Sequence, residues 1–155
     1  MFDGYTVLPL RITVCASVIF VWCGDRVIDA YSGQNYEHRQ AWVEERLLYL
    51  SSVFAIDICA FAILSNHYHI VLKVQSHQAQ QWDETEVIKR WRRLYKGESV
   101  LIDRYQEGKT TGAEITKAKE VINDWRANLT SISWFMKSIN QYIACEANKE
   151  DNCTG

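Results

Sequence analysis

The sequence lacks the features that mark several large classes of protein. Its 17 Lys and Arg against 19 Asp and Glu give a formal net charge of -2, so any contact with nucleic acid has to come from a local basic patch. Its five cysteines are an odd number without a Cys-x-x-Cys pair, which fits neither a disulfide framework nor a zinc finger. A reducing cytoplasm is therefore the expected location.

Long apolar runs are absent as well. The stretch ITVCASVIFVWC, residues 12–23, is 12 residues long, whereas a helix that spans a bilayer needs about 20. It follows Asp3, has only Arg11 as a basic residue ahead of it, and lacks a small-residue cleavage site, so it does not resemble a signal peptide. We interpret it as a buried strand and predict no association with membranes.

The pattern that is present predicts one α+β domain, since 155 residues with 48% hydrophobic content can bury a substantial core. Residues 36–54 predict an amphipathic helix, with apolar residues at helical spacing at Trp42, Val43, Leu47, Leu50 and Phe54. Residues 56–64 are apolar on both faces, which predicts a central strand covered on both sides. After a turn at Ser65-Asn66, residues 67–74 predict a second strand.

The second half of the chain changes to helical periodicity. A helix begins at an Asp cap, Asp83, carries acidic residues in its first turn and is followed by Gly97. A short helix or loop and two longer helices follow, and no internal repeat is present. The expected fold is therefore a small antiparallel sheet with helices packed on it and a helical C-terminal half.

Two histidines one residue apart form the clearest candidate site. Side chains alternate along a strand, so His67 and His69 share one face while Tyr68 points to the core. Their Cα atoms are expected to lie about 7 Å apart, close enough for both imidazoles to bind one metal ion, for which His is the commonest ligand. A third ligand would have to come from elsewhere. The alternative is two half-exposed polar residues without a ligand.

The stretch FAILSNHYHIVL, residues 61–72, resembles the His-hydrophobic-His segment of the REP-associated tyrosine transposases, within the single-tyrosine HUH nucleases. The resemblance continues through residues 36–74 and returns over residues 132–155, so that it covers roughly residues 33–155. It implies an HUH-type fold with a ferredoxin-like or RRM-like core.

The same resemblance implies chemistry on single-stranded or hairpin DNA. In such enzymes the two histidines, here His67 and His69, hold a divalent ion, usually Mg²⁺ or Mn²⁺, that polarises the scissile phosphate. A tyrosine on a later helix attacks the phosphorus and leaves a 5′-phosphotyrosine link, from which the strand is later rejoined. The implied activity is DNA transposition, a form of recombination, with DNA as partner and a homodimer as one expected oligomeric state.

The family's nucleophile is not matched in this sequence. There the tyrosine is followed within a few residues by Asn-Pro, whereas the single proline here is Pro9. The resemblance thus predicts one incomplete, truncated domain over residues 1–155, with the nucleophile segment beyond it and the catalytic residue unknown. Tyr142, one helical turn before Glu146, is a candidate substitute, although its place in an apolar stripe with Phe135 and Ile139 favours packing.

Two other functions stay open. One is a DNA-binding remnant that folds but does not cleave. The other is a metal-dependent hydrolase in which His67, His69 and a carboxylate such as Asp57 bind the ion and water is the nucleophile. Covalent trapping separates the transposase from both, because only a tyrosine nucleophile leaves DNA attached to the protein.

A basic segment, KRWRRLYK at residues 89–96, is the expected DNA contact. Its five basic residues are Lys89, Arg90, Arg92, Arg93 and Lys96. Such cations contact phosphates, and the aromatic Trp91 and Tyr95, one turn apart, could stack on exposed bases. The alternative is a solvated helix face whose aromatic residues pack against the rest of the protein.

Overall fold

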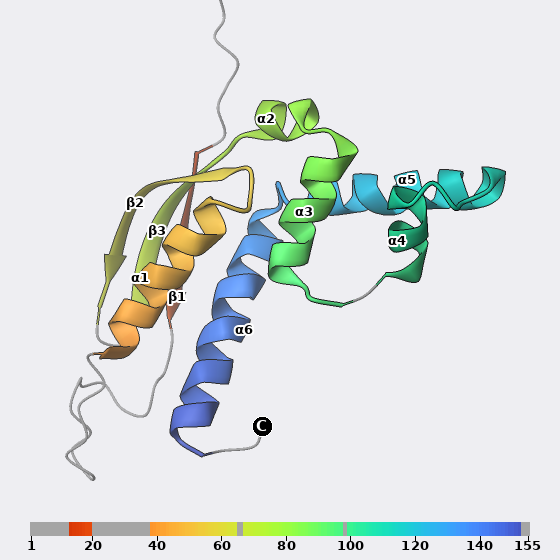
Figure 1. Cartoon of the computed structure of the whole chain (residues 1–155). Helices are drawn as coiled ribbons and strands as arrows, with labels where there is room; N and C mark the ends of the chain where they lie inside the picture. The colour runs from red at the N-terminus through yellow and green to blue at the C-terminus, as the bar shows by residue number, and fades with distance from the viewer. Residues whose placement is uncertain (1–12, 20–37, 65–66, 98, 153–155) are drawn as a thin grey trace, which may run out of the picture.

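The computed structural model describes residues 13–19, 38–64, 67–97 and 99–152 (Figure 1). Along the chain these form β1 (Thr13–Ile19), α1 (His38–Ser51), β2 (Ile56–Ile63), β3 (His67–Val74), α2 (Ser76–Gln81), α3 (Glu84–Leu94), α4 (Val100–Gln106), α5 (Gly112–Asn128) and α6 (Ile132–Glu150). The predicted α+β class, with a small antiparallel sheet and a helical second half, is confirmed. The strand predicted over residues 12–23 is observed as β1, and the remainder of that stretch lies outside the described residues.

The sheet has the strand order β1-β3-β2, and both pairings are antiparallel. The hairpin register pairs Ile63 with Tyr68 at one end and Ile56 with Val74 at the other. The strand that carries the histidines is therefore the central one, hydrogen-bonded on both sides and held more firmly than an edge strand.

The prediction that residues 56–64 form a central strand covered on both sides is wrong. β2 is an edge strand of the described sheet, and its residues from Cys59 to Ala62 are exposed. A register irregularity between Ile58 and Ala60 also interrupts its pairing with β3. Apolar content alone misled the prediction, because it cannot indicate which strand will receive neighbours on both sides.

The core lies between one face of the sheet and the helices. Tyr68, Ile70 and Leu72 of β3 are almost fully buried. They belong to the same cluster as residues of α1 and α6, namely Val43, Leu47, Leu50, Phe135, Ile139 and Ile143. The hydroxyl of Tyr68 donates a 2.7 Å hydrogen bond to Asn140 Oδ1, which places α6 on this face. Figure 1 shows α1 and α6 beside the sheet.

An ion-pair cluster joins the beginning of α1 to the end of α6. Arg39, whose side chain is only 3% exposed, donates from Nε to Glu150 Oε2 at 2.7 Å and from Nη2 to Asp151 Oδ1 at 2.5 Å. His38 lies 2.7 Å from the other oxygen of Glu150. Burial by itself would raise the pKa of Glu150, but Arg39 and His38 outweigh it and hold that pKa below its usual value.

The remaining helices form a second layer of packing around tryptophans. Asp83 caps α3 by accepting a hydrogen bond from the backbone N–H of Glu86, as the sequence predicts. Trp91 of α3 stacks on Trp125 of α5 with ring centres 5.4 Å apart and planes 10° from parallel. Among the described residues, no helix is both long enough and apolar enough to cross a bilayer.

Candidate functional site

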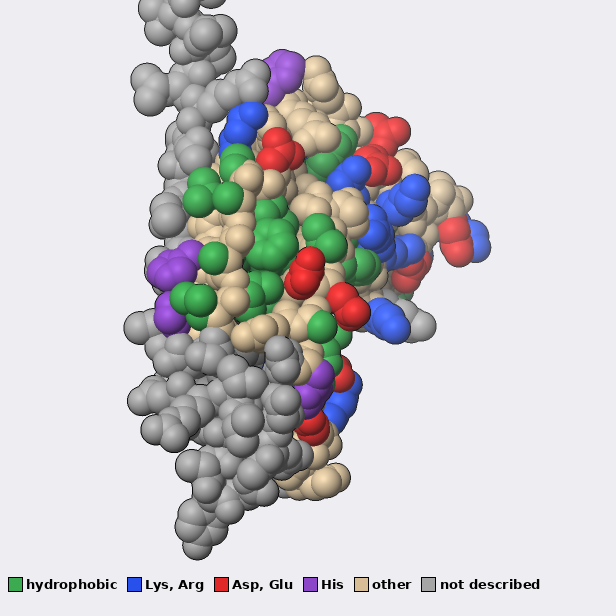
Figure 2. Space-filling model, turned by 90° about the vertical axis from the view of Figure 1, so that its left-hand side faces the viewer, with side chains coloured by type: hydrophobic (Ala, Val, Ile, Leu, Met, Phe, Trp, Pro, Cys, Tyr) green, Lys and Arg blue, Asp and Glu red, His purple; other side chains and the backbone are tan. Residues whose placement is uncertain are grey.

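The histidine pair lies on the face of β3 opposite the core. Tyr68 between them is buried, whereas His69 is exposed and His67 half-buried, as strand alternation predicts. The two imidazole centres are 5.0 Å apart, with their planes at 88°. Figure 2 shows two His side chains together on this side of the molecule, next to hydrophobic side chains. The central strand thus holds both rings close together on one face.

The spacing of the two rings is compatible with one shared metal ion. With a metal–nitrogen bond of about 2.1 Å, two imidazoles in neighbouring coordination positions have ring centres roughly 4.6 to 5.3 Å apart, for angles between octahedral and tetrahedral. The observed 5.0 Å agrees with that range. The described residues contain no group of three or more His, Cys, Asp or Glu side chains arranged to hold a metal. They therefore offer His67 and His69 as a two-ligand set.

Asp57 is not brought to the histidines. It is paired with Lys73 in the hairpin register, four residues beyond His69 on β3. At a strand rise of about 3.3 Å per residue, this places it about 13 Å from His69 along the sheet. Its carboxylate accepts a hydrogen bond from the side-chain amide of Gln75. The geometry of the described residues gives no support to a hydrolase centre formed by Asp57 and the two histidines.

Tyr142 also lies away from the histidines. It belongs to α6, which packs on the Tyr68 side of the sheet, and its half-buried ring lies 4.8 Å from the guanidinium of Arg46. Glu146, its expected carboxylate neighbour, forms an ion pair with Lys149 instead. Burial raises the pKa of Tyr68 far above its usual value, so its phenol stays protonated. Neither tyrosine is placed to attack a phosphate bound at the histidines.

The arginines of the basic helix are engaged in contacts within the protein. Arg90 Nη1 donates to the carbonyl oxygens of Ser52 and Val53, both at 3.0 Å, and its Nε donates to Glu86 at 2.6 Å. Arg93 donates to the hydroxyl of Ser52 at 2.8 Å. These two arginines hold α3 against the turn that follows α1. Arg92 forms an ion pair with Asp103 of α4.

Lys89 and Lys96 are exposed and have neither an ion pair nor a side-chain hydrogen bond within the described parts of the chain, whereas the arginines, including the exposed Arg93, make such contacts. Trp91 and Tyr95, in contrast, pack against Trp134, with ring centres 5.4 and 5.9 Å away. The aromatic residues of the segment are therefore used in packing, as the alternative interpretation holds. Within this segment, the two lysines are the cations available to a ligand.

The basic helix and the histidine pair are at different places on the protein. Arg90 and Arg93 contact Ser52, close to Ile56, which pairs with Val74 at the end of β3 farthest from His67. The seven residue steps of β3 between these ends span about 23 Å. A single-stranded DNA that contacts both regions would therefore have to be several nucleotides long.

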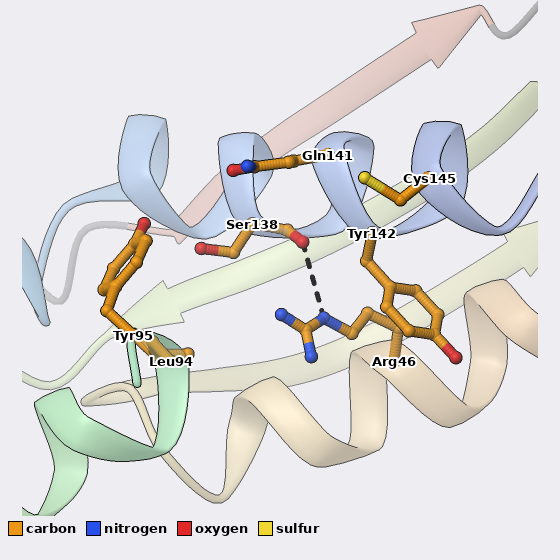
Figure 3. Close-up of a pocket in the computed structure, with 7 residues that line it drawn as sticks. All are labelled: Arg46, Leu94, Tyr95, Ser138, Gln141, Tyr142 and Cys145. Atoms are coloured by element: carbon orange, nitrogen blue, oxygen red, sulfur yellow. Dashed lines mark hydrogen bonds between the residues drawn. The ribbon is translucent and has the colours of Figure 1, made fainter. Parts of the chain in front are cut away.

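A second group of residues was not found from the sequence. A pocket between α1, α6 and the end of α3 is lined by Arg46, Tyr95, Ser138 and Tyr142 among others (Figure 3). These residues come from three separate segments, and the sequence showed Arg46 only as one polar residue of an amphipathic helix. No local signal connects them.

Comparison of the chain with models of protein families, with curated proteins and with solved structures gave no match.

Proposed function

We propose that this protein binds single-stranded or hairpin DNA in the manner of the REP-associated tyrosine transposases, with a divalent ion at His67 and His69. The observation that carries the proposal is the closeness of the two imidazoles, whose ring centres lie 5.0 Å apart on the sheet face opposite the helices. The position of the motif on the middle strand of an antiparallel sheet supports it, because a strand paired on both sides holds its side chains firmly.

The described residues account for binding better than for cleavage. When bound, a divalent ion at the imidazoles supplies a Lewis acid that polarises a phosphoryl oxygen. His67 and His69 orient that phosphate, and Lys89 and Lys96 neutralise others farther along the strand. Imidazole ligands favour Mn²⁺ over Mg²⁺, since Mg²⁺ prefers oxygen ligands. Cleavage and rejoining through a 5′-phosphotyrosine, the family reaction, would need a nucleophile other than Tyr68 or Tyr142.

Metal binding provides the first test. Titration of the protein with Mn²⁺, followed by calorimetry, should give saturable binding that weakens at least about tenfold in His67→Ala and in His69→Ala. His77→Ala is the matched control, because His77 is an exposed histidine on α2 and its loss should leave the affinity for Mn²⁺ unchanged. Equal affinity in all four proteins would contradict the metal site.

DNA binding provides the second test. Fluorescence anisotropy with a labelled single-stranded oligonucleotide should show binding that Mn²⁺ strengthens in the wild type and not in His69→Ala. A denaturing gel of the same mixture should show no covalent adduct. An adduct that disappears in Tyr142→Phe would make Tyr142 the nucleophile and would overturn the proposal that this chain does not cleave through it. A location in the cytoplasm and a homodimer belong to the same proposal.

A further inference from the structure

A pocket of about 200 Å³ lies on the helical side of the protein, away from the histidine pair. α1 supplies Arg46, α6 supplies Ser138 and Tyr142, and the residue that follows α3 supplies Tyr95. In Figure 3 the guanidinium of Arg46 lies between Tyr95 and Tyr142. Typical pockets for drug-sized ligands are larger, about 300 to 1,000 Å³, so the volume suits a small ligand.

Arg46 is a half-buried cation without a carboxylate partner among the described residues. Among the described residues, its Nε donates a hydrogen bond to the carbonyl oxygen of Ser138 at 3.4 Å. The guanidinium carbon lies 4.8 Å from the ring of Tyr142 and 5.2 Å from that of Tyr49. Burial lowers the pKa of Arg46, although an arginine stays charged at neutral pH. Glu45 and Arg46 both line an adjoining hollow, but no ion pair joins these two side chains among the described residues.

Tyr95 lines the same pocket and carries a hydroxyl that makes no hydrogen bond among the described residues. Its hydroxyl oxygen is shielded from solvent and has no hydrogen-bond partner in the described structure. Its ring is fixed against Trp91, with ring centres 4.9 Å apart, and against Trp134 at 5.9 Å. A buried hydroxyl without a partner destabilises the folded state, so its presence calls for an explanation. An acceptor oxygen bound in the pocket would provide one.

We propose that this pocket binds a phosphate group, with the Arg46 guanidinium as counter-ion and the Tyr95 hydroxyl as a second donor. Both side chains offer donors and neither needs a donor in return, which fits a ligand that consists of acceptor oxygens. The Ser138 hydroxyl already donates to the Trp134 carbonyl oxygen at 2.8 Å, so it adds no donor to the site. The phosphate could belong to a free ester or to a nucleic-acid backbone. This inference does not depend on the metal site.

The test uses the whole chain and four proteins: wild type, Arg46→Gln, Tyr95→Phe and the control Tyr105→Phe. Tyr105 is a phenol outside the pocket, bonded to Glu84. Inorganic phosphate and a nucleoside 5′-monophosphate are titrated by calorimetry, and thermal unfolding is compared with chloride at equal ionic strength. We expect phosphate to raise the Tm of the wild type and of Tyr105→Phe more than chloride does. Arg46→Gln should lose this binding.

Tyr95→Phe separates the ligand role from a packing role. Without ligand its Tm should rise, because the unpartnered hydroxyl is gone, while its Kd for phosphate should increase about tenfold through the lost hydrogen bond. Phosphate that stabilises the wild type no more than chloride, or a Tyr95→Phe protein that binds as tightly as the wild type, would overturn the proposal. This second variant decides the matter even if Arg46→Gln does not fold.

A labelled single-stranded oligonucleotide distinguishes the two sources of phosphate. A backbone phosphate predicts that Arg46→Gln weakens oligonucleotide binding as well, whereas a free ester predicts that it leaves oligonucleotide binding unchanged. In either case His67→Ala should still bind inorganic phosphate like the wild type. The proposal of a phosphate pocket can therefore be confirmed even if the proposal of a metal site is wrong.

Discussion

Arg90 should stabilise the fold rather than bind DNA, and its replacement by Ala tests this directly. Its side chain is 20% exposed and makes hydrogen bonds to two backbone carbonyl oxygens after α1 and to Glu86. Its guanidinium carbon also lies 4.1 Å from the centre of the Trp82 ring. In Arg90→Ala the carbonyls of Ser52 and Val53 lose this donor, and α3 loses a contact with the turn that follows α1.

The magnitude follows from these contacts. Hydrogen bonds that involve a charged group contribute about 1.5 to 3 kcal/mol, and partial exposure and water that replaces the arginine reduce the loss. A cation over an aromatic ring adds about 0.5 to 1 kcal/mol. We expect Arg90→Ala to lower the free energy of unfolding by about 2 to 3 kcal/mol, which in a protein of this size lowers Tm by roughly 5 to 10 °C.

Lys89→Ala is the matched control, because Lys89 neighbours Arg90 on α3 but is exposed. It should change the free energy of unfolding by less than about 0.5 kcal/mol. If the helix contacts phosphates, Lys89→Ala should reduce the slope of log DNA affinity against log salt concentration by about one. Arg90→Ala should leave this slope unchanged. Urea unfolding and anisotropy at several salt concentrations measure the two effects. The reasoning fails if Arg90→Ala unfolds like the wild type and flattens the salt dependence as Lys89→Ala does.

Three further predictions follow from the contacts of the core and the sheet edge. Glu150→Gln should lower stability at pH 7 by about 1 to 2 kcal/mol through the loss of one charge partner of buried Arg39. Because the folded pKa of Glu150 is lowered, its stabilisation is present above pH 4.5 and lost as pH falls further, so urea midpoints of this variant should depend less on pH between 5 and 3. Tyr68→Phe, which removes the hydrogen bond to Asn140, should cost about 1 kcal/mol in thermal unfolding. Phe61→Lys should reduce any self-association seen by sedimentation, because this large apolar side chain is 39% exposed on an edge strand.

The parts of the fold that depend on local periodicity could be predicted from the sequence. Alternation along a strand places His67 and His69 opposite Tyr68 whatever the rest of the chain does, and the structure has this arrangement. The helical spacing of apolar residues in 36–54 and the Asp83 cap likewise depend only on residues a few positions apart. The α+β class could be predicted because the sequence changes from strand alternation in its first half to helical spacing in its second half.

The parts that depend on distant partners could not be predicted. Whether β2 lies at the centre or the edge depends on where β1 pairs, which no pattern within β2 encodes. The charge of the segment around Arg90 indicates affinity for oxygen acceptors, but not that these acceptors are the carbonyls of Ser52 and Val53 rather than phosphates. Arg46 and Tyr95 likewise meet only after α1 and α3 have packed together.

α6 connects the two proposed sites, because it contacts both the strand beneath the histidines and the anion pocket. Asn140 bonds to Tyr68, which lies between His67 and His69, while Ser138 and Tyr142 line the pocket. The strand is paired on both sides and buried on its inner face, so a small change in α6 has little freedom to turn the imidazoles. The pocket lacks that constraint, since its walls come from three helical segments that pack through side chains. Ligand binding in the pocket should therefore act mainly on the packing of α1, α3 and α6, and the geometry of the histidine pair should stay fixed.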